Sequence, residues 1–207
     1  MKRFDTLLSL AALTLAGALS VATTAAFAQE TNDTTESENS DTGSVELNLG
    51  EEPKPEIGQA YSKEKFGDWD MRCLRTENPD DDPCQMYQLV NDEAGNPVAE
   101  VSMFRLPGDG QAKAGATIVV PLETALQDRL TIQIDGGAAK QYPFSFCNRL
   151  GCYARIGFTD DDIAAYKRGA VANLVIKAIV NPGENVVLPL SLTGFTAAFE
   201  NVSVIQQ

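Results

Sequence analysis

Four cysteines in two close pairs constrain the fold of this chain more than any other feature. Ten residues separate Cys73 from Cys84, and four separate Cys147 from Cys152. An even number of paired cysteines is typical of a disulfide framework when a chain is exported, and of a metal or redox site when it stays in a reducing compartment. The interpretation of these cysteines therefore depends on where the chain is delivered.

The first 28 residues have the pattern of a secretory signal peptide. Two basic residues precede an apolar run over 7–19, and Ala26 and Ala28 occupy the small-residue positions before a cleavage site. The run is shorter than the roughly 20 residues that span a bilayer, so we expect no transmembrane segment in the mature chain. We predict a mature chain that begins near Gln29 and is exported to the periplasm, with attachment to the outer membrane or secretion as alternatives.

Export favours two structural disulfides. A zinc site would need four converging cysteine or histidine ligands, and the chain contains no histidine. The spacings do not match paired zinc knuckles, and the C-x-x-C motif of redox dithiols is absent. Of the three possible connectivities, we predict Cys73–Cys84 and Cys147–Cys152, because each pair closes a local hairpin. We expect neither a metal nor a cofactor.

Composition divides the mature chain near residue 60. Residues 29–60 hold nine Asp or Glu, one Lys and no aromatic residue, which predicts an acidic disordered linker. Residues 61–207 are long enough for one domain with its own core. The net charge of the whole chain is −13, which argues against nucleic acid as a partner. The linker is either a solvated spacer or an acidic arm, which would keep the domain away from an anionic surface or bind a basic partner.

Residues 61–207 show the period-2 alternation of β-strands, separated by turns that contain Gly and Pro. The predicted strands cover 69–73, 84–90, 98–106, 116–120, 130–135, 142–147, 152–158, 171–180 and 186–192. One short helix is predicted over 160–168, with Thr159 as its N-cap and Gly169 after its end. Trp69 is predicted to pack in the core, with contact to a ligand as the alternative. The fold class is all-β, an antiparallel β-sandwich with one short helix and two disulfides.

The sequence lacks the residue patterns of common enzymes. Without histidine there is no Ser-His-Asp triad and no Cys-His pair. We interpret two acidic clusters, Asp80–Asp82 and Asp160–Asp162, as solvated charge, the second at a helix N-terminus. Calcium binding is a weaker alternative for the first cluster. We predict no catalytic residues.

Five short segments occur together in this order: FGDWDMRC (66–73), CQM (84–86), IDGG (134–137), CNRLGC (147–152) and LSLTGFTAAF (190–199). With them the chain resembles the bacterial invasion-associated locus B family. The resemblance implies a secreted envelope protein with an immunoglobulin-like β-sandwich, in a family whose founding role in virulence is assistance in host-cell invasion. It also implies structural roles for Gly67, Gly151, Gly194, Trp69 and Phe195, and no catalytic residues.

We expect a non-enzymatic binding module whose partner is an unidentified envelope or host protein. The Gly-rich loop over 106–115 is a candidate for binding because sandwiches bind through end loops, and loop mobility alone is the alternative. Two other functions stay open. One is a carboxylate-dependent hydrolase of envelope glycans, which needs two acids in one pocket. The other is an envelope assembly or stress factor that uses the acidic segment. The sequence leaves the oligomeric state open.

Overall fold

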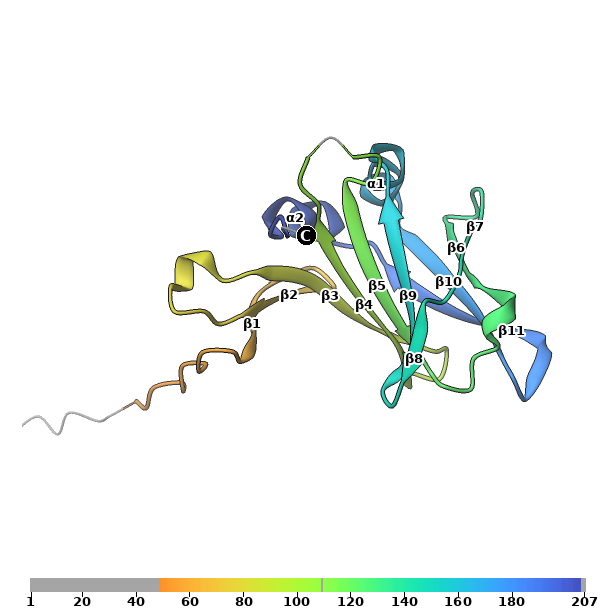
Figure 1. The fold of residues 1–207 in the computed structure, drawn as a ribbon, viewed down its shortest axis with the longest axis horizontal. Coiled ribbons are helices and arrows are strands. Elements are labelled where there is room, and N and C mark those ends of the chain that lie inside the picture. The colour runs from red at the N-terminus through yellow and green to blue at the C-terminus, as the bar shows by residue number, and fades with distance from the viewer. Residues whose placement is uncertain (1–48, 109, 206–207) are drawn as a thin grey trace, which may run out of the picture. The chain divides into compact units, whose positions relative to one another are not determined.

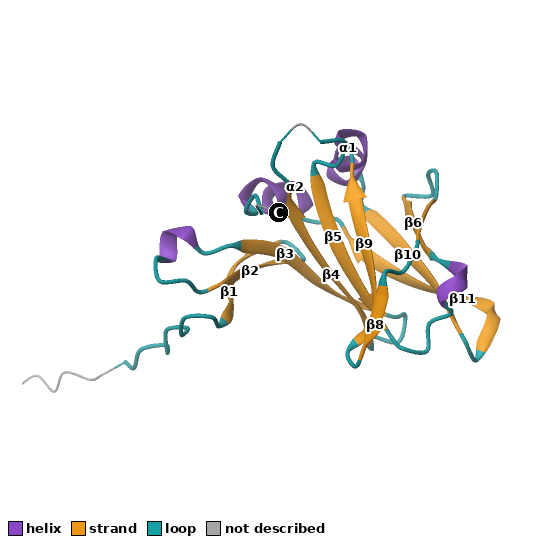
Figure 2. Ribbon diagram, viewed as in Figure 1, coloured by secondary structure: helices purple, strands orange, loops and turns teal. Residues whose placement is uncertain are grey.

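The computed structural model describes residues 49–108 and 110–205, so the predicted signal peptide and most of the predicted linker lie outside the described residues. From Glu51 on, the chain forms one compact unit. Figure 2 distinguishes its strands from its helices. The strands are β1 (Ala60–Phe66), β2 (Trp69–Leu74), β3 (Cys84–Asn91), β4 (Pro97–Arg105), β5 (Ala114–Val120), β6 (Leu130–Ile134), β7 (Lys140–Tyr142), β8 (Phe146–Asn148), β9 (Gly151–Phe158), β10 (Val171–Ala178) and β11 (Asn181–Ser191). The helices are α1 (Asp160–Arg168) and α2 (Phe195–Asn201), with short 3-10 turns at Pro79–Asp81 and Leu126–Asp128.

The strands form two antiparallel sheets (Figure 1). The larger sheet has the order β1-β2-β3-β4-β5-β9-β8, and the smaller has the order β11-β10-β6-β7. Inward side chains from both sheets form one hydrophobic core, which confirms the predicted antiparallel sandwich. Figure 1 shows α1 and the β8–β9 turn at opposite ends of β9.

Alternation along the strands decides which side chains enter the core, because successive side chains point to opposite faces. In β10, Ala172, Leu174 and Ile176 are buried, as the sequence pattern predicts. The strand ends at Ala178, two residues earlier than predicted. Val180 therefore lies in the turn before β11, where it is 76% exposed.

The predicted single strand over 142–147 is wrong. Tyr142 ends β7 in the smaller sheet, whereas Phe146 begins β8 in the larger sheet. Pro143 lies between them and has no N–H for a strand ladder, so the chain passes from one sheet to the other there. Strand β1 and helix α2 were not predicted from the sequence. The N-cap of α2 is Gly194, which has no side chain to cap the helix. The Ser, Thr, Asp or Asn that usually indicates a helix start in a sequence is therefore absent.

Residues 66–69 and 191–195, far apart in the sequence, meet at a contact that we call the seam. The Asp68 N–H donates to the Thr193 carbonyl oxygen at 3.2 Å, and the Ser191 hydroxyl donates to the Asp68 carboxylate at 2.6 Å. These residues belong to two of the five segments that carry the family resemblance. Their shared role in the structure is to join the start of β2 to the end of β11.

Trp69 and Phe195 continue the seam into the core. Both side chains are almost completely buried, at 0% and 1% exposed, as predicted for Trp69. Their rings meet edge to face with centroids 5.6 Å apart, an arrangement favoured by the ring quadrupoles.

Gln88 links the two sheets beside the seam. Its carboxamide accepts the Ser191 N–H at 2.9 Å and donates to the Ser191 carbonyl oxygen at 3.1 Å. A side-chain amide thus takes the place of a neighbouring strand for the last residue of β11. The pair of bonds satisfies a buried amide that would otherwise destabilise the core.

The four cysteines form two disulfides, Cys73–Cys84 and Cys147–Cys152. In each case the two cysteines are directly opposite each other in neighbouring antiparallel strands, β2–β3 and β8–β9. This is the predicted pairing, and each disulfide closes a local hairpin, as expected.

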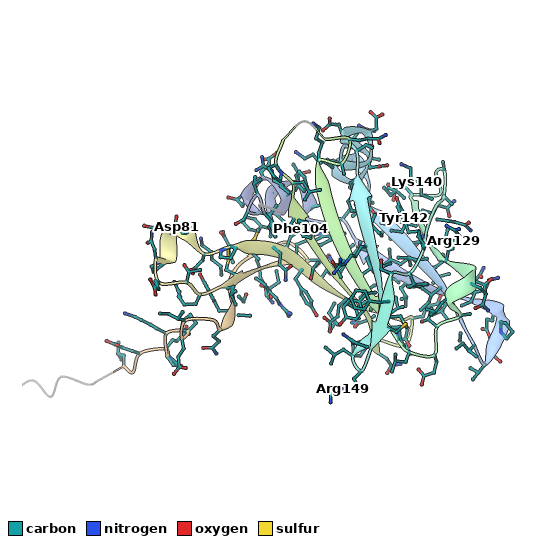
Figure 3. All side chains as sticks on the ribbon, viewed as in Figure 1. Asp81, Phe104, Arg129, Lys140, Tyr142 and Arg149 are labelled. Atoms are coloured by element: carbon teal, nitrogen blue, oxygen red, sulfur yellow. A yellow bond between two sulfur atoms is a disulfide. The ribbon has the colours of Figure 1, made fainter. Side chains whose placement is uncertain are left out.

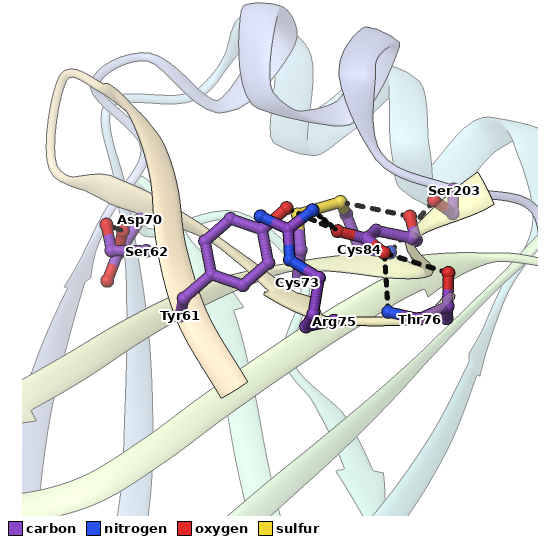
Figure 4. The surroundings of a disulfide bond; sticks show 9 residues. Tyr61, Ser62, Asp70, Cys73, Arg75, Thr76, Cys84 and Ser203 are labelled. Atoms are coloured by element: carbon purple, nitrogen blue, oxygen red, sulfur yellow. Dashed lines mark hydrogen bonds and ion pairs between the residues drawn. A yellow bond between two sulfur atoms is a disulfide. The ribbon is translucent and has the colours of Figure 1, made fainter. Parts of the chain in front are cut away.

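Asp82 lies beside the first disulfide, with its carbonyl oxygen 3.4 Å from Cys84 Sγ. Figure 4 labels Cys84 and three residues that contact the Asp82 carboxylate, Tyr61, Arg75 and Thr76. The Asp82 carboxylate accepts the Tyr61 hydroxyl at 2.6 Å and the Thr76 N–H at 2.7 Å, and it pairs with Arg75 at 2.9 Å. The interpretation of Asp82 as solvated charge is wrong, because its side chain has no exposed area. Burial alone would raise the pKa of this carboxyl, but the hydrogen bonds and Arg75 outweigh burial and hold the pKa below its ordinary value.

Candidate functional site

A cleft of about 400 Å³ lies between α1 and the β6–β7 segment, and we call it the α1 cleft. Its apolar lining includes Ile132, Ile134, Ala165 and Tyr166, and its polar lining comprises Asp135, Lys140, Tyr142, Asp162 and Arg168. Figure 3 marks Lys140 and Tyr142, the two lining residues contributed by β7. An apolar interior with a few polar groups at its edge is typical of a ligand-binding cleft.

Helix α1 is held at its N-terminus by a reciprocal cap. The Thr159 hydroxyl oxygen accepts the Asp162 N–H at 3.3 Å, and the Asp162 carboxylate accepts the Thr159 N–H at 3.1 Å. This capping box confirms Thr159 as the N-cap and fixes the direction in which Asp162 faces the cleft. The acidic cluster 160–162 thus includes one residue with a defined structural role.

The end of α1 packs closely on the smaller sheet. Gly169 follows the helix, but its φ is −75°, in the extended region rather than the left-handed conformation common after helices. A side chain at Gly169 would place its Cβ 2.6 Å from a methyl of Ile134 and 2.8 Å from a methyl of Leu192. Glycine is required here because helix and sheet approach closely.

The IDGG segment forms the turn at the edge of the cleft. Asp135 and Gly136 have φ values of 45° and 72°, and the Gly137 N–H donates to the Ile134 carbonyl oxygen at 2.8 Å. Two positive φ values and this bond are features of a type I′ turn, for which Asp-Gly is a favoured pair. The Asp135 carboxylate accepts the N–H groups of Val171 and Ala170, at 2.9 Å and 2.8 Å, and these bonds hold its pKa below the ordinary value.

Lys140 and Asp162 form an ion pair across the cleft. The hydrogen bond to Asp162 raises the pKa of Lys140. Burial alone would raise the pKa of Asp162, but Lys140 and Thr159 outweigh burial and hold it below the ordinary value. Burial also raises the pKa of Tyr142, so its hydroxyl stays protonated at neutral pH. Among the described residues, Arg168 has no ion-pair partner.

The cleft contains two carboxylates, which is the arrangement that a glycan hydrolase would need. Such an enzyme requires one acid with a raised pKa, protonated at working pH, beside a second ionised acid. The pKa values of Asp135 and Asp162 are both lowered, and both side chains are already hydrogen-bonded. Neither carboxyl is placed to donate a proton, so this geometry favours binding over hydrolysis.

A second groove, of about 680 Å³, runs along the seam and contains four acidic residues. Asp68 accepts the Ser191 hydroxyl, Asp70 accepts Ser62, and Asp92 accepts Asn96. These carboxylates serve local hydrogen bonds. Within 49–108 and 110–205, no three His, Cys, Asp or Glu side chains are grouped to hold a metal. In the same residues, no helix is long and apolar enough to cross a membrane.

In the loop proposed from the sequence, 106–115, the described residues 106–108 and 110–115 do not line the α1 cleft. The Leu106 N–H donates to the Lys113 carbonyl oxygen at 2.9 Å, which closes the loop at its base. The α1 cleft was not predicted from the sequence. Its signals were the Asp-Gly turn and the helix cap, but only the fold brings these two segments together.

Acid is expected to remove the contribution of Asp162 to stability. Asp162→Ala should lower the free energy of unfolding by about 1 kcal/mol at pH 7, the usual contribution of a cap. Because the folded-state pKa lies below the unfolded value, the contribution is complete above that value and is lost as pH falls through the folded pKa. Urea unfolding should therefore show wild type and Asp162→Ala converging below about pH 4.

Asp161→Ala, which removes a neighbouring charge without a hydrogen bond, should change stability by only a few tenths of a kcal/mol. A difference between wild type and Asp162→Ala that stays constant with pH would contradict this account.

Comparison with known proteins matches residues 69–203 to the family described as invasion associated locus B (IalB) protein. The chain belongs to the invasion associated locus B family. The match includes the α1 cleft, all four cysteines, and Trp69 and residues 191–195 of the seam, so the family resemblance inferred from five short segments is confirmed.

Two relatives in this family come from Brucella abortus. Invasion protein B homologues of strain 2308 and of biovar 1 strain 9-941 are each 26% identical to this chain over 149 residues, covering 72% of this chain and 83% of the relative. The crystal structure of invasion associated protein b from Bartonella henselae aligns with a TM-score of 0.53 and 23% identity, over 65% of this chain and 91% of that chain. The likeness to this crystal structure supports the fold of the invasion associated locus B domain.

Proposed function

We propose that this protein is an exported, non-enzymatic member of its family that acts as a binding module in the cell envelope or at the host interface. The α1 cleft is proposed as the binding site. The observation that supports this most directly is the combination of an apolar lining with ionised, hydrogen-bonded carboxylates at the edge. Such a cleft can bind and orient a ligand without a group that donates a proton to it.

Export is supported by the sequence and by the disulfides. The pattern over 1–28 is that of a signal peptide, and two disulfides are stable in an oxidising compartment such as the periplasm. The named relatives are invasion proteins, which agrees with a role at a bacterial surface. The partner would be an envelope or host protein.

Two neighbouring cations on α1 provide a matched test. Arg168 lines the cleft without an ion pair, whereas Lys167 lies outside it and pairs with Glu200 at 3.1 Å. Mature protein, residues 29–207, would be cross-linked in intact cells and its partners identified by mass spectrometry. Arg168→Glu should reduce capture of the partner about tenfold, since a reversed charge at the edge of a cleft opposes a ligand selected by the original charge. Lys167→Glu should capture as much partner as wild type.

The contrary outcomes are equally specific. Equal capture by both variants would exclude the α1 cleft as the binding site. Release of sugars from envelope glycans by the purified protein, abolished by Asp162→Asn, would support the hydrolase instead. Loss of the partner on deletion of residues 29–60, with the cleft intact, would support an assembly factor that uses the acidic segment.

A further inference from the structure

Three polar groups that line the α1 cleft have no partner. The hydroxyls of Tyr142 and Tyr166 form no hydrogen bond within the residues that the structure describes, and Arg168 forms no ion pair there. Tyr166 is only 4% exposed, so a ligand reaches its hydroxyl by entering the cleft. A deeply placed donor without an acceptor costs free energy, which a ligand with acceptor oxygens recovers on binding.

The packing of the Tyr166 ring directs its hydroxyl into the cleft. The ring meets Phe158 edge to face with centroids 5.1 Å apart, and its centroid lies 5.4 Å from that of Phe195, so this side of the ring is in the core. Burial raises the pKa of the Tyr166 hydroxyl, and Tyr142 and Asp162 raise it further, which places both of these cleft residues near it. The hydroxyl therefore stays protonated and can donate to a ligand.

The charges of the lining favour an uncharged ligand. Lys140 pairs with Asp162, and Arg168 is balanced by Asp135, the fourth charged residue of the lining. The exposed residues 160–161 add two negative charges at the start of α1. A carboxylate ligand would gain nothing from this charge distribution. A peptide carbonyl oxygen, which belongs to a neutral group, can accept from Arg168 without that repulsion.

Strand β7 gives the cleft an unpaired strand edge. It is the outermost strand of the smaller sheet, and it pairs only with β6 (Figure 1). Along a strand, successive residues direct their backbone N–H and C=O groups to opposite sides. Part of β7 therefore faces away from β6, and no described residue bonds to its backbone on that side. Such an edge can pair with another extended chain.

Two other sheet edges are protected against such pairing, whereas β7 is not. Strand β1 has a bulge after Ser62 and carries two lysines, and β11 contains Pro182 and Pro189. Bulges, lysines and prolines are the features that usually prevent pairing at an edge. Strand β7 has neither a bulge nor a proline, and the Lys140 side chain is held by Asp162.

The edge and the apolar lining lie on the same face of the β6–β7 hairpin. Ile132 is directly opposite Lys140 in the ladder, and directly opposed residues direct their side chains to one face of a sheet. A chain that pairs with β7 would place every second side chain on this face. There it would meet the cleft, whose lining includes Ile134 and Ala165.

The cleft is small, closed at one end and held by its own contacts. At the closed end, Gly169 packs against Ile134. The volume of about 400 Å³ is near the lower limit for ligand clefts, and it suits a side chain with its backbone rather than a folded surface. The cap at Thr159 and the turn at Asp135 hold the two walls, so binding requires little ordering of the protein.

We propose that the α1 cleft binds a short extended segment of its partner by strand addition. The segment pairs with β7 and places an uncharged apolar side chain between the β6–β7 hairpin and α1. Its carbonyl oxygens accept from Tyr142, Tyr166 and Arg168. The inference rests on the proposed function, because it names the chemistry of the partner at the same site.

Peptide capture tests the chemistry of the ligand. Mature protein, residues 29–207, would be screened against an immobilised random library of acetylated, amidated heptapeptides. We expect the captured peptides to share an uncharged apolar residue at one position. N-methylation of every second peptide nitrogen should abolish binding in one register and leave it unchanged in the other, because a strand directs alternate N–H groups to its neighbour.

The unpartnered tyrosine hydroxyls provide a matched set of variants. Tyr142→Phe with Tyr166→Phe should weaken binding of a captured peptide about tenfold, because two donors are lost. Tyr153→Phe is the control, since Tyr153 lies outside the cleft and its hydroxyl oxygen accepts the Asn148 side chain at 3.2 Å. The control should bind like wild type. Thermal unfolding should show the double variant to be as stable as wild type, because neither lost hydroxyl has a partner among the described residues.

Four outcomes would contradict the inference. Capture of no peptide would overturn strand addition. The proposed function would then stand if Arg168→Glu still reduces partner capture in cells, and it would fail as well if Arg168→Glu has no effect. Binding that appears only with free carboxyl ends would indicate an anionic ligand, and binding that is insensitive to N-methylation would exclude pairing with β7. Binding of neutral envelope sugars, without any peptide, would identify a glycan site instead.

Discussion

Gly194→Ala is expected to destabilise the protein by about 3 kcal/mol or more, near the upper end for single substitutions. Gly194 has a φ of 83°, and a Cβ there would lie 2.0 Å from the Phe66 carbonyl oxygen and 2.8 Å from the Gly67 nitrogen. These are backbone atoms, which cannot rotate away from the new Cβ as the end of a flexible side chain could. The substitution would therefore separate residues 66–69 from 191–195 and open the seam.

Gly95 provides a control with the same backbone strain and no contact. Its φ is 86°, and a Cβ there would meet nothing within 4 Å. Gly95→Ala should cost about 1 kcal/mol, the penalty of a left-handed conformation alone. Urea unfolding of both variants measures the difference, and similar losses would show that strain in φ, rather than the close approach at the seam, explains the glycine.

The seam shows why part of the fold was predictable and part was not. Alternation predicted most core positions of β10, because that pattern is local. The contact of Gly67 with Thr193, and of Trp69 with Phe195, depends on the path of the whole chain, and no periodicity reports it. The two segments were recognised as family features before the structure showed that they touch each other.

The α1 cleft, like the seam, combines features that are local in the sequence with contacts that depend on the path of the whole chain. The helix and its cap at Thr159 were predicted correctly from local chemistry. The ion pair of Lys140 with Asp162 was not predicted, because Lys140 lay outside the predicted strands and only Tyr142 of β7 lay inside one. Asp82 was misinterpreted for a related reason. Its neighbours in sequence are acidic, but its partners in space are Tyr61 and Arg75, one of which comes from the missed strand β1.

The two disulfides are expected to contribute unequally. Replacing Cys73 and Cys84 together by alanine should cost about 4 kcal/mol, combining the lost constraint on the unfolded chain with the cavity left by two buried side chains. Replacing Cys147 and Cys152 together should cost about 2 kcal/mol, because Cys147 is exposed and leaves little cavity. Urea unfolding under non-reducing conditions gives both values.

The difference in stability between the two double variants distinguishes two explanations of how the first disulfide stabilises the protein. The sequence separations are 11 and 5 residues, and loop entropy alone makes the two bridges differ by less than about 1 kcal/mol. A larger difference must come from packing around Cys84, whose N–H donates to the Ser203 hydroxyl at 2.9 Å and whose carbonyl oxygen accepts the Ser203 N–H at 3.1 Å. Through Ser203 the bridge holds residues 203–205, which pair with Arg105 on β4. Equal losses in the two double variants would mean that this C-terminal contact is stable without the disulfide, and that both bridges act only on the unfolded chain.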